Sequence, residues 1–154
     1  MKKILSILLA MLMLTAVFCA APVSMSAANV EVAETGATVS SDGTARLYFN
    51  MAAVSWWDTA SSNGGNFGYF FNNSTGKNAW SAKAVKYSGN TYYIVIPAGD
   101  WAGVILTRNS VTSNASWNNK WNQTGDITLS ATSNYISKFA DGSASVTWGT
   151  AVKP

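Results

Sequence analysis

The segment with the most side chains suited to binding a ligand is 117–127, which reads WNNKWNQTGDI. Its two tryptophans, Trp117 and Trp121, stand four residues apart among amides, one lysine and one threonine. A core strand would not carry so many hydrogen-bonding groups, because each needs a partner once it is buried. A surface that binds a ligand with an apolar face and a hydroxyl-rich rim would use this combination. A sugar ring has that shape, so the segment predicts carbohydrate binding.

Side chains that support catalysis are scarce. The sequence has no histidine, and its one cysteine, Cys19, lies in a signal-like segment. Triads of the Ser-His-Asp and Cys-His kinds are therefore excluded, and the common zinc sites lose their preferred ligands. Glycoside hydrolysis commonly needs two facing carboxylates. The candidate aspartates lie in or beside turns, where such side chains usually bond nearby backbone groups: Asp58, Asp100, Asp126 and Asp141. We expect a protein that is not an enzyme and uses no metal or cofactor.

A second aromatic group spans residues 67–80. Phe67, Tyr69 and Phe71 share one face of a predicted strand, because side chains alternate along a strand. Trp80 follows a loop long enough to fold back, and antiparallel pairing would place it beside Phe67 and Tyr69. These rings form either a sugar-stacking platform or part of the core. The platform interpretation requires that Tyr69 and Trp80 be open to solvent. The polar residues expected around it are Asn66, Asn72, Asn78 and Lys83.

Two further features bear on the binding surface. Trp56 and Trp57 are adjacent in polar surroundings, and consecutive side chains of an extended chain point in opposite directions. One ring can therefore be buried while the other is exposed, and Trp57 is a candidate ligand contact. Lys83 and Lys120 are candidate contacts at the rim.

Several segments occur in the order seen in a known family of starch-binding domains. They are YFN at 48–50, Trp57, FGYFF at 67–71, Trp80, YYIVIP at 92–97, VILTRN at 104–109 and WNQTGD at 121–126. Over residues 46–129 the chain resembles carbohydrate-binding module family 26, to which family 25 is closely related. The resemblance implies a β-sandwich that binds α-1,4-glucans such as amylose and maltooligosaccharides.

The family's platform is two tyrosines two residues apart and a downstream tryptophan. The resemblance assigns these roles to Phe67, Tyr69 and Trp80, with Phe67 in place of the usual tyrosine. Gln123 falls at the family's QT position, where it either supports the site or closes the sandwich. Trp117 and Trp121 belong either to the same site or to a second one.

The elements that must position these residues are strands. The chain after the signal-like segment is rich in Ser, Thr, Asn, Gly, Trp and Tyr, which suits an exported all-β domain. Eight or nine short strands with regular turn signals predict an all-β, two-sheet antiparallel β-sandwich of the immunoglobulin-like or carbohydrate-binding-module type. The main predicted strands are 45–50, 67–71, 80–87, 91–96, 102–107, 126–129, 135–139 and 145–148.

Residues 1–27 have the pattern of a secretory signal peptide. Lys2 and Lys3 precede an apolar run at 4–18, and small residues follow. We therefore expect a secreted, extracellular protein with one domain at 28–154. Without Lys2 and Lys3, the ten basic residues become eight, against seven acidic ones. This near-neutral balance gives no reason to expect nucleic acid or a membrane as a partner.

The sequence thus favours a secreted, non-catalytic module that binds starch and related α-1,4-glucans, with a separate amylase as a candidate neighbour. The alternative is a secreted β-sandwich for adhesion or protein interaction that binds another glycan or a protein, since exposed aromatic patches also mark such surfaces. A small glycosidase is a third interpretation, and the shortage of suitable carboxylates disfavours it.

Overall fold

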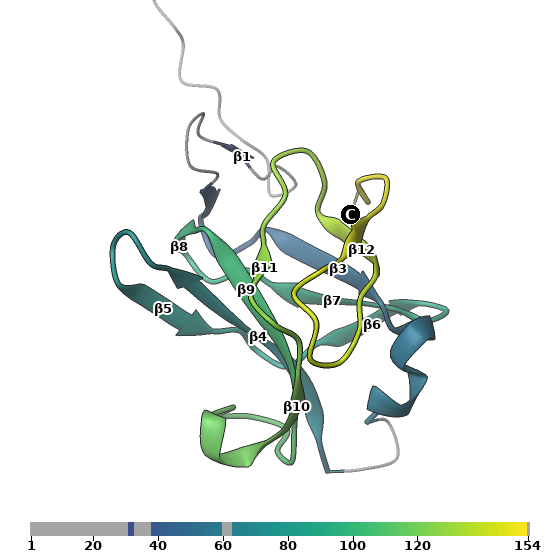
Figure 1. The fold of residues 1–154 in the computed structure, drawn as a ribbon. Helices are drawn as coiled ribbons and strands as arrows, with labels where there is room; N and C mark the ends of the chain where they lie inside the picture. Colours follow the sequence, from purple (N-terminus) through teal and green to yellow (C-terminus); the bar gives the residue numbers. More distant parts are fainter. Residues whose placement is uncertain (1–30, 33–37, 60–62, 154) are drawn as a thin grey trace, which may run out of the picture.

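The computed structural model describes residues 38–59 and 63–153 and the backbone of 31–32. The predicted signal segment lies outside the described residues. Strands dominate the described part of the chain, and two five-stranded sheets form its main layers (Figure 1). The all-β sandwich predicted from the sequence is confirmed. No helix among the described residues has the length and apolar character needed to cross a membrane.

The first large sheet, called here the β4 sheet, has the order β10-β9-β4-β5, and β11 also pairs with β9. Its strands are β4 (Gly65–Asn72), β5 (Lys77–Trp80), β9 (Gly103–Asn109), β10 (Lys120–Gln123) and β11 (Ile127–Thr128). All its pairs are antiparallel. Strand β9 is almost fully buried, and it includes most of the predicted strand at 102–107.

The second large sheet, the β3 sheet, has the order β13-β12-β3-β7-β6. Its strands are β3 (Arg46–Asn50), β6 (Val85–Ser88), β7 (Thr91–Val95), β12 (Tyr135–Lys138) and β13 (Thr147–Trp148). Strands β12 and β3 run parallel, in contrast to the other pairs of this sheet. The remaining elements are a small sheet of β1 (Glu31–Val32), β2 (Val39–Ser41) and β8 (Gly99–Trp101), and the 3-10 helices η1 (Met51–Trp57) and η2 (Trp117–Asn119).

The core lies between the two large sheets. Alternate residues of β4 and β9 supply one side, among them Phe70, Val104 and Leu106, and Leu47 and Ile94 of the β3 sheet supply the other. Because side chains alternate along a strand, the residues between these core positions point to the outer faces. The outer face of the β4 sheet therefore includes Tyr69, Phe71 and Ile105.

The predicted strand 80–87 is two strands in different sheets. Strand β5 ends at Trp80 and β6 begins at Val85, so residues 81–84 carry the chain from one layer to the other. Ser81 marks the end of β5. Its N–H donates to the Gly68 carbonyl (2.8 Å), and its Oγ accepts from the Gly68 N–H (2.9 Å).

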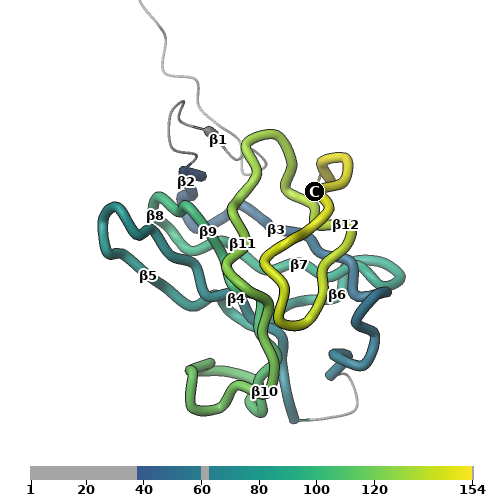
Figure 2. The backbone as a smooth tube through the Cα atoms, viewed as in Figure 1, coloured from purple at the N-terminus to yellow at the C-terminus, as the bar shows by residue number. Residues whose placement is uncertain are grey.

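The C-terminal part closes the sandwich beside the QTGD segment, as the backbone trace shows (Figure 2). The Gly125 N–H donates to the Ser143 carbonyl (2.9 Å), and the Gly142 N–H donates to the Gln123 carbonyl (2.8 Å). A Cβ on Gly125 would lie 2.7 Å from the backbone nitrogen of Ala144. This close approach of two backbones explains why residue 125 is a glycine.

Trp57 is a core residue, so its prediction as a ligand contact is wrong. It is the last residue of η1 and is only 1% exposed, and its ring packs edge-to-face on Phe139 at 5.5 Å. Trp56 next to it is 53% exposed. The expected split into one buried and one exposed ring is thus confirmed, although a 3-10 helix produces it instead of an extended chain.

Replacing Trp57 should destabilise the fold far more than replacing its neighbour. Trp57→Ala removes a buried indole, and we expect the free energy of unfolding to fall by about 3–5 kcal/mol. Trp56→Ala is the matched control; it removes an exposed indole whose ring meets Trp57 edge-to-face at 6.1 Å, and should lower it by about 1 kcal/mol or less. Urea denaturation followed by circular dichroism measures both. Equal losses in the two variants would contradict this assignment.

Candidate functional site

Three aromatic side chains meet on the outer face of the β4 sheet. We call Tyr69, Trp80 and Trp117 the aromatic cluster. The ring centroids lie 5.2 Å apart for Tyr69 and Trp80, 4.7 Å for Tyr69 and Trp117, and 5.0 Å for Trp80 and Trp117. Every pair is edge-to-face, with interplanar angles of 61–62°. Such pairs contribute about 0.5–1.5 kcal/mol each beyond the area they bury, so the rings hold one another in place.

Strand register brings the first two rings together. Tyr69 of β4 pairs directly with Trp80 of β5, as antiparallel pairing of these segments predicts. Both side chains are half-buried, and neither is part of the core between the sheets. The requirement that Tyr69 and Trp80 not be sealed inside the sandwich is therefore met.

Trp117 reaches the cluster from a loop that a buried asparagine braces. The Asn109 side chain, which is fully buried, donates through Nδ2 to the Ser116 carbonyl (3.0 Å) and to Asn119 Oδ1 (2.6 Å). Asn119 Oδ1 also accepts from the Ser116 N–H (3.0 Å). The Ser110 N–H donates to the Asn119 carbonyl (2.8 Å). These bonds fix the backbone on both sides of Trp117.

Phe67 does not belong to an exposed platform, which corrects the prediction. It shares the outer face of β4 with Tyr69 but is only 1% exposed. The loop at 110–116 covers it: a Cβ on Gly65 would lie 2.8 Å from the Phe67 ring, 3.0 Å from the Val111 carbonyl oxygen and 3.1 Å from Lys83 Cδ. Phe67 packs beneath the loop, and Trp117 instead of Phe67 is the third ring of the aromatic cluster.

The polar residues predicted at the site divide into two groups. Lys120 lies near the cluster, with Nζ 6.0 Å from the Trp117 ring, and it donates to Gln123 Oε1 (2.5 Å). Lys83 donates to the Gly64 carbonyl (2.9 Å) and so braces the structure. Asn66 and Asn72 are buried; they donate to the carbonyls of Trp57 (3.3 Å) and Asp100 (3.1 Å), respectively. The two asparagines therefore do not surround the rings as expected, whereas Asn78 is exposed on the outer face.

Trp121 lies apart from the cluster. It is 47% exposed, and the guanidinium of Arg108 sits 4.6 Å from its ring centre. Arg108 alternates along β9 with the outer-facing Thr107, and it pairs across the strands with the buried Asn66. A register shift in β10 between Lys120 and Asn122 turns Trp121 toward Arg108, on the face of the sheet opposite to the aromatic cluster. Trp117 and Trp121 therefore do not form one surface.

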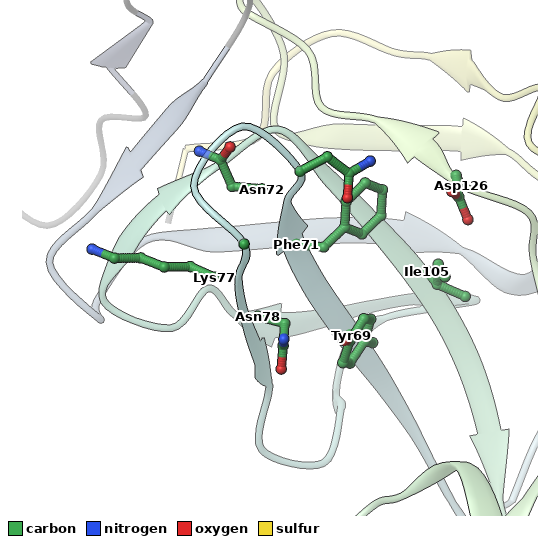
Figure 3. Close-up of a pocket in the computed structure, with 9 residues that line it drawn as sticks. Tyr69, Phe71, Asn72, Lys77, Asn78, Ile105 and Asp126 are labelled. Atoms are coloured by element: carbon green, nitrogen blue, oxygen red, sulfur yellow. The ribbon is translucent and has the colours of Figure 1, made fainter.

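Two hollows flank the aromatic cluster on the outer face. One, of about 190 Å³, has Tyr69, Phe71 and Ile105 along its floor and Asn78 and Asp126 at its edge (Figure 3). The other, of about 730 Å³, lies between Trp80 and the 112–115 segment. The sequence did not predict the first hollow as a site. Period-two alternation along the strand places Phe71 on the same face as Tyr69, but no local pattern shows that β11 brings Asp126 next to them.

Comparison with known proteins gives no family. The chain matches no protein-family model, no curated protein and no solved structure. Among the described residues no group of three or more His, Cys, Asp or Glu side chains could hold a metal ion. What this surface can do chemically is cover an apolar face with indole and phenol rings and bind hydroxyl groups at its edges.

Removing the brace of the Trp117 loop should loosen the aromatic cluster. Asn109→Ala removes the two hydrogen bonds that Asn109 Nδ2 donates, to the Ser116 carbonyl and to Asn119 Oδ1, and each contributes about 0.5–1.5 kcal/mol. We expect a weaker near-ultraviolet circular dichroism signal and faster quenching of tryptophan fluorescence by acrylamide. Asn118→Ala, at an exposed position in the same loop, is the control and should change neither signal. An unaltered spectrum in Asn109→Ala would show that the amide does not hold the loop.

Proposed function

We propose that this protein is a non-catalytic module that binds starch and related α-1,4-glucans through the aromatic cluster. The observation that carries the proposal is the mutual inclination of the three rings by 61–62°. Rings inclined to one another suit a ligand that bends as it passes over them. An α-1,4-linked glucan follows a curved path, whereas a β-1,4-linked glucan is a flat ribbon. The resemblance to carbohydrate-binding module family 26 supports the same ligand.

The expected strength of binding follows from area and hydrogen bonds. A pyranose turns a patch of C–H groups toward a ring, and covering ~60–80 Å² of apolar surface contributes roughly 2 kcal/mol. Each directional hydrogen bond to a hydroxyl group adds about 1 kcal/mol. Lys120 and Gln123 lie at the edge of the cluster to make such bonds. After the cost of association, dissociation constants on the order of μM to mM result.

The signal-like segment at 1–27 supports the further proposal that the protein is secreted and acts outside the cell. A starch-binding module without catalytic groups would then keep its chain at the surface of a polysaccharide. A separate amylase is the natural neighbour for such a module, because it would act on the same polymer.

Removing any ring of the cluster should abolish retention by starch. We expect the wild-type protein to be retarded in native gels that contain amylose or amylopectin, and to run freely in gels with carboxymethylcellulose. Tyr69→Ala, Trp80→Ala and Trp117→Ala should each lose the retardation, because each removes part of the stacking surface. Trp56→Ala removes an exposed indole outside the cluster and should behave like wild type. Full retardation of all three cluster variants would refute this binding surface.

Calorimetry tests the ligand class directly. Titration with maltoheptaose should give heat and a dissociation constant in the μM to mM range, and titration with cellohexaose should give none. Equal binding of the two sugars would contradict the argument from ring inclination.

The alternative function, binding of another glycan or a protein, is favoured by a different surface. On the outer face of the β3 sheet, Val85 and Tyr87 are exposed, and the Tyr87 ring packs edge-to-face on Tyr48 at 5.0 Å. Exposed aromatic residues of this kind are frequent in protein interfaces. A glycan array without signal for any α-glucan, together with a protein ligand lost in Tyr87→Ser, would favour this alternative.

A further inference from the structure

The smaller hollow beside Tyr69 combines an apolar floor with a polar edge. Its floor is formed by Tyr69, Phe71 and Ile105, and Asp126 and Asn78 lie on opposite sides of these three residues (Figure 3). Asp126 and Asn78 are exposed. The volume of about 190 Å³ is below the ~300–1,000 Å³ typical of pockets for whole small molecules. It suits a single small unit of a longer ligand.

The position of the Phe71 ring depends on a glycine in the neighbouring strand. Phe71 pairs with Gly103 of β9, and a Cβ on Gly103 would lie 2.3 Å from Phe71 Cζ and 2.8 Å from Cε2. The ring therefore lies down over the Gly103 backbone instead of standing away from the sheet. In this position it contributes its surface to the floor of the hollow and remains partly exposed.

The larger hollow on the other side of Trp80 has a different character. Its only ring besides Trp80 is Phe67, which is buried beneath the loop and offers almost no surface. Its lysine, Lys83, already donates to the Gly64 carbonyl. The hollow beside Tyr69 instead has two partly exposed rings and an exposed carboxylate. A sugar chain that leaves the aromatic cluster therefore finds the better surface on the Phe71 side.

We propose that the hollow is a second sugar subsite, which binds one further glucose unit of a chain held by the aromatic cluster. This inference rests on the proposed function. Tyr69 joins the two places, because it contacts Trp80 and Trp117 and also lines the hollow. Phe71 follows two residues later on the same face, about 7 Å along the strand.

The polar groups at the hollow match the hydroxyl pattern of a sugar. The carboxylate of Asp126 accepts hydrogen bonds from two neighbouring hydroxyl groups, and charge makes such bonds strong. The amide of Asn78 both donates and accepts. Phe71 meanwhile covers the C–H face of the unit. Lys77 extends away from the rings (Figure 3) and takes no part.

A chain-length series measured by calorimetry tests the subsite. In the wild-type protein the affinity for maltoheptaose should exceed that for maltotriose by about tenfold, which corresponds to ~1.4 kcal/mol. Phe71→Leu and Asp126→Asn should reduce this gain to about twofold or less and leave the affinity for maltotriose unchanged. Asp141→Asn, at another exposed aspartate, is the matched control and should keep the full gain. Melting curves establish that each variant is folded.

The outcomes separate this inference from the function on which it rests. If maltotriose and maltoheptaose bind the wild-type protein equally, or if both subsite variants keep the full gain, the subsite is refuted while glucan binding stands. A loss of maltotriose binding in Asp126→Asn would also refute it, because the carboxylate would then belong to the primary site. If no maltooligosaccharide binds the folded wild-type protein, the proposed function falls and the subsite falls with it.

Discussion

The pairing of β4 with β5 and β9 is the constraint on which the rest of this structure depends. Strand β4 has a core face that carries Phe70 and an outer face that carries Tyr69. A slip of one residue would exchange the two faces, because side chains alternate with a period of two. The register that buries Phe70 between the sheets is thus the same register that sets Tyr69 beside Trp80. The hydrophobic effect that drives packing of the core also builds the outer surface.

This coupling explains which parts of the site could be predicted from the sequence. Tyr69 and Trp80 were placed correctly side by side because a strand, a turn and a second strand follow each other in the chain. Local alternation and antiparallel pairing were sufficient for that step. The strand at 45–50 was predictable from its own alternation, and the strand at 102–107 from the consecutive apolar residues at 104–106, since both signals lie within the segment itself.

The errors concern burial that distant segments decide. Phe67 has the same alternation as Tyr69, but the loop at 110–116 covers one of them and not the other. Trp57 looked like a surface residue because its sequence neighbours are polar. The 3-10 helix η1 instead turns its ring onto Phe139, which directly follows β12. Trp117 was predicted for either the same site or a second one, and the choice between them depends on the contacts of Asn109 and Asn119, which lie far from Tyr69 and Trp80 in sequence. No local pattern reports such contacts.

The proposed binding surface needs rigidity, and the sequence after the signal-like segment contains no cysteine that could supply a disulfide. Each ring of the cluster is instead restrained by the other two, and the amide network at Asn109 fixes the loop that brings Trp117 in. Restraint before binding matters because side chains that become ordered on association cost roughly 0.5–1.5 kcal/mol each. For a ligand whose stacking contributes only about 2 kcal/mol per ring, that cost would remove much of the gain. The edge-to-face packing of the rings on one another therefore does not prevent them from contacting a ligand. It orders the indoles in advance, while Trp117, at 42% exposure, keeps open area for the proposed ligand.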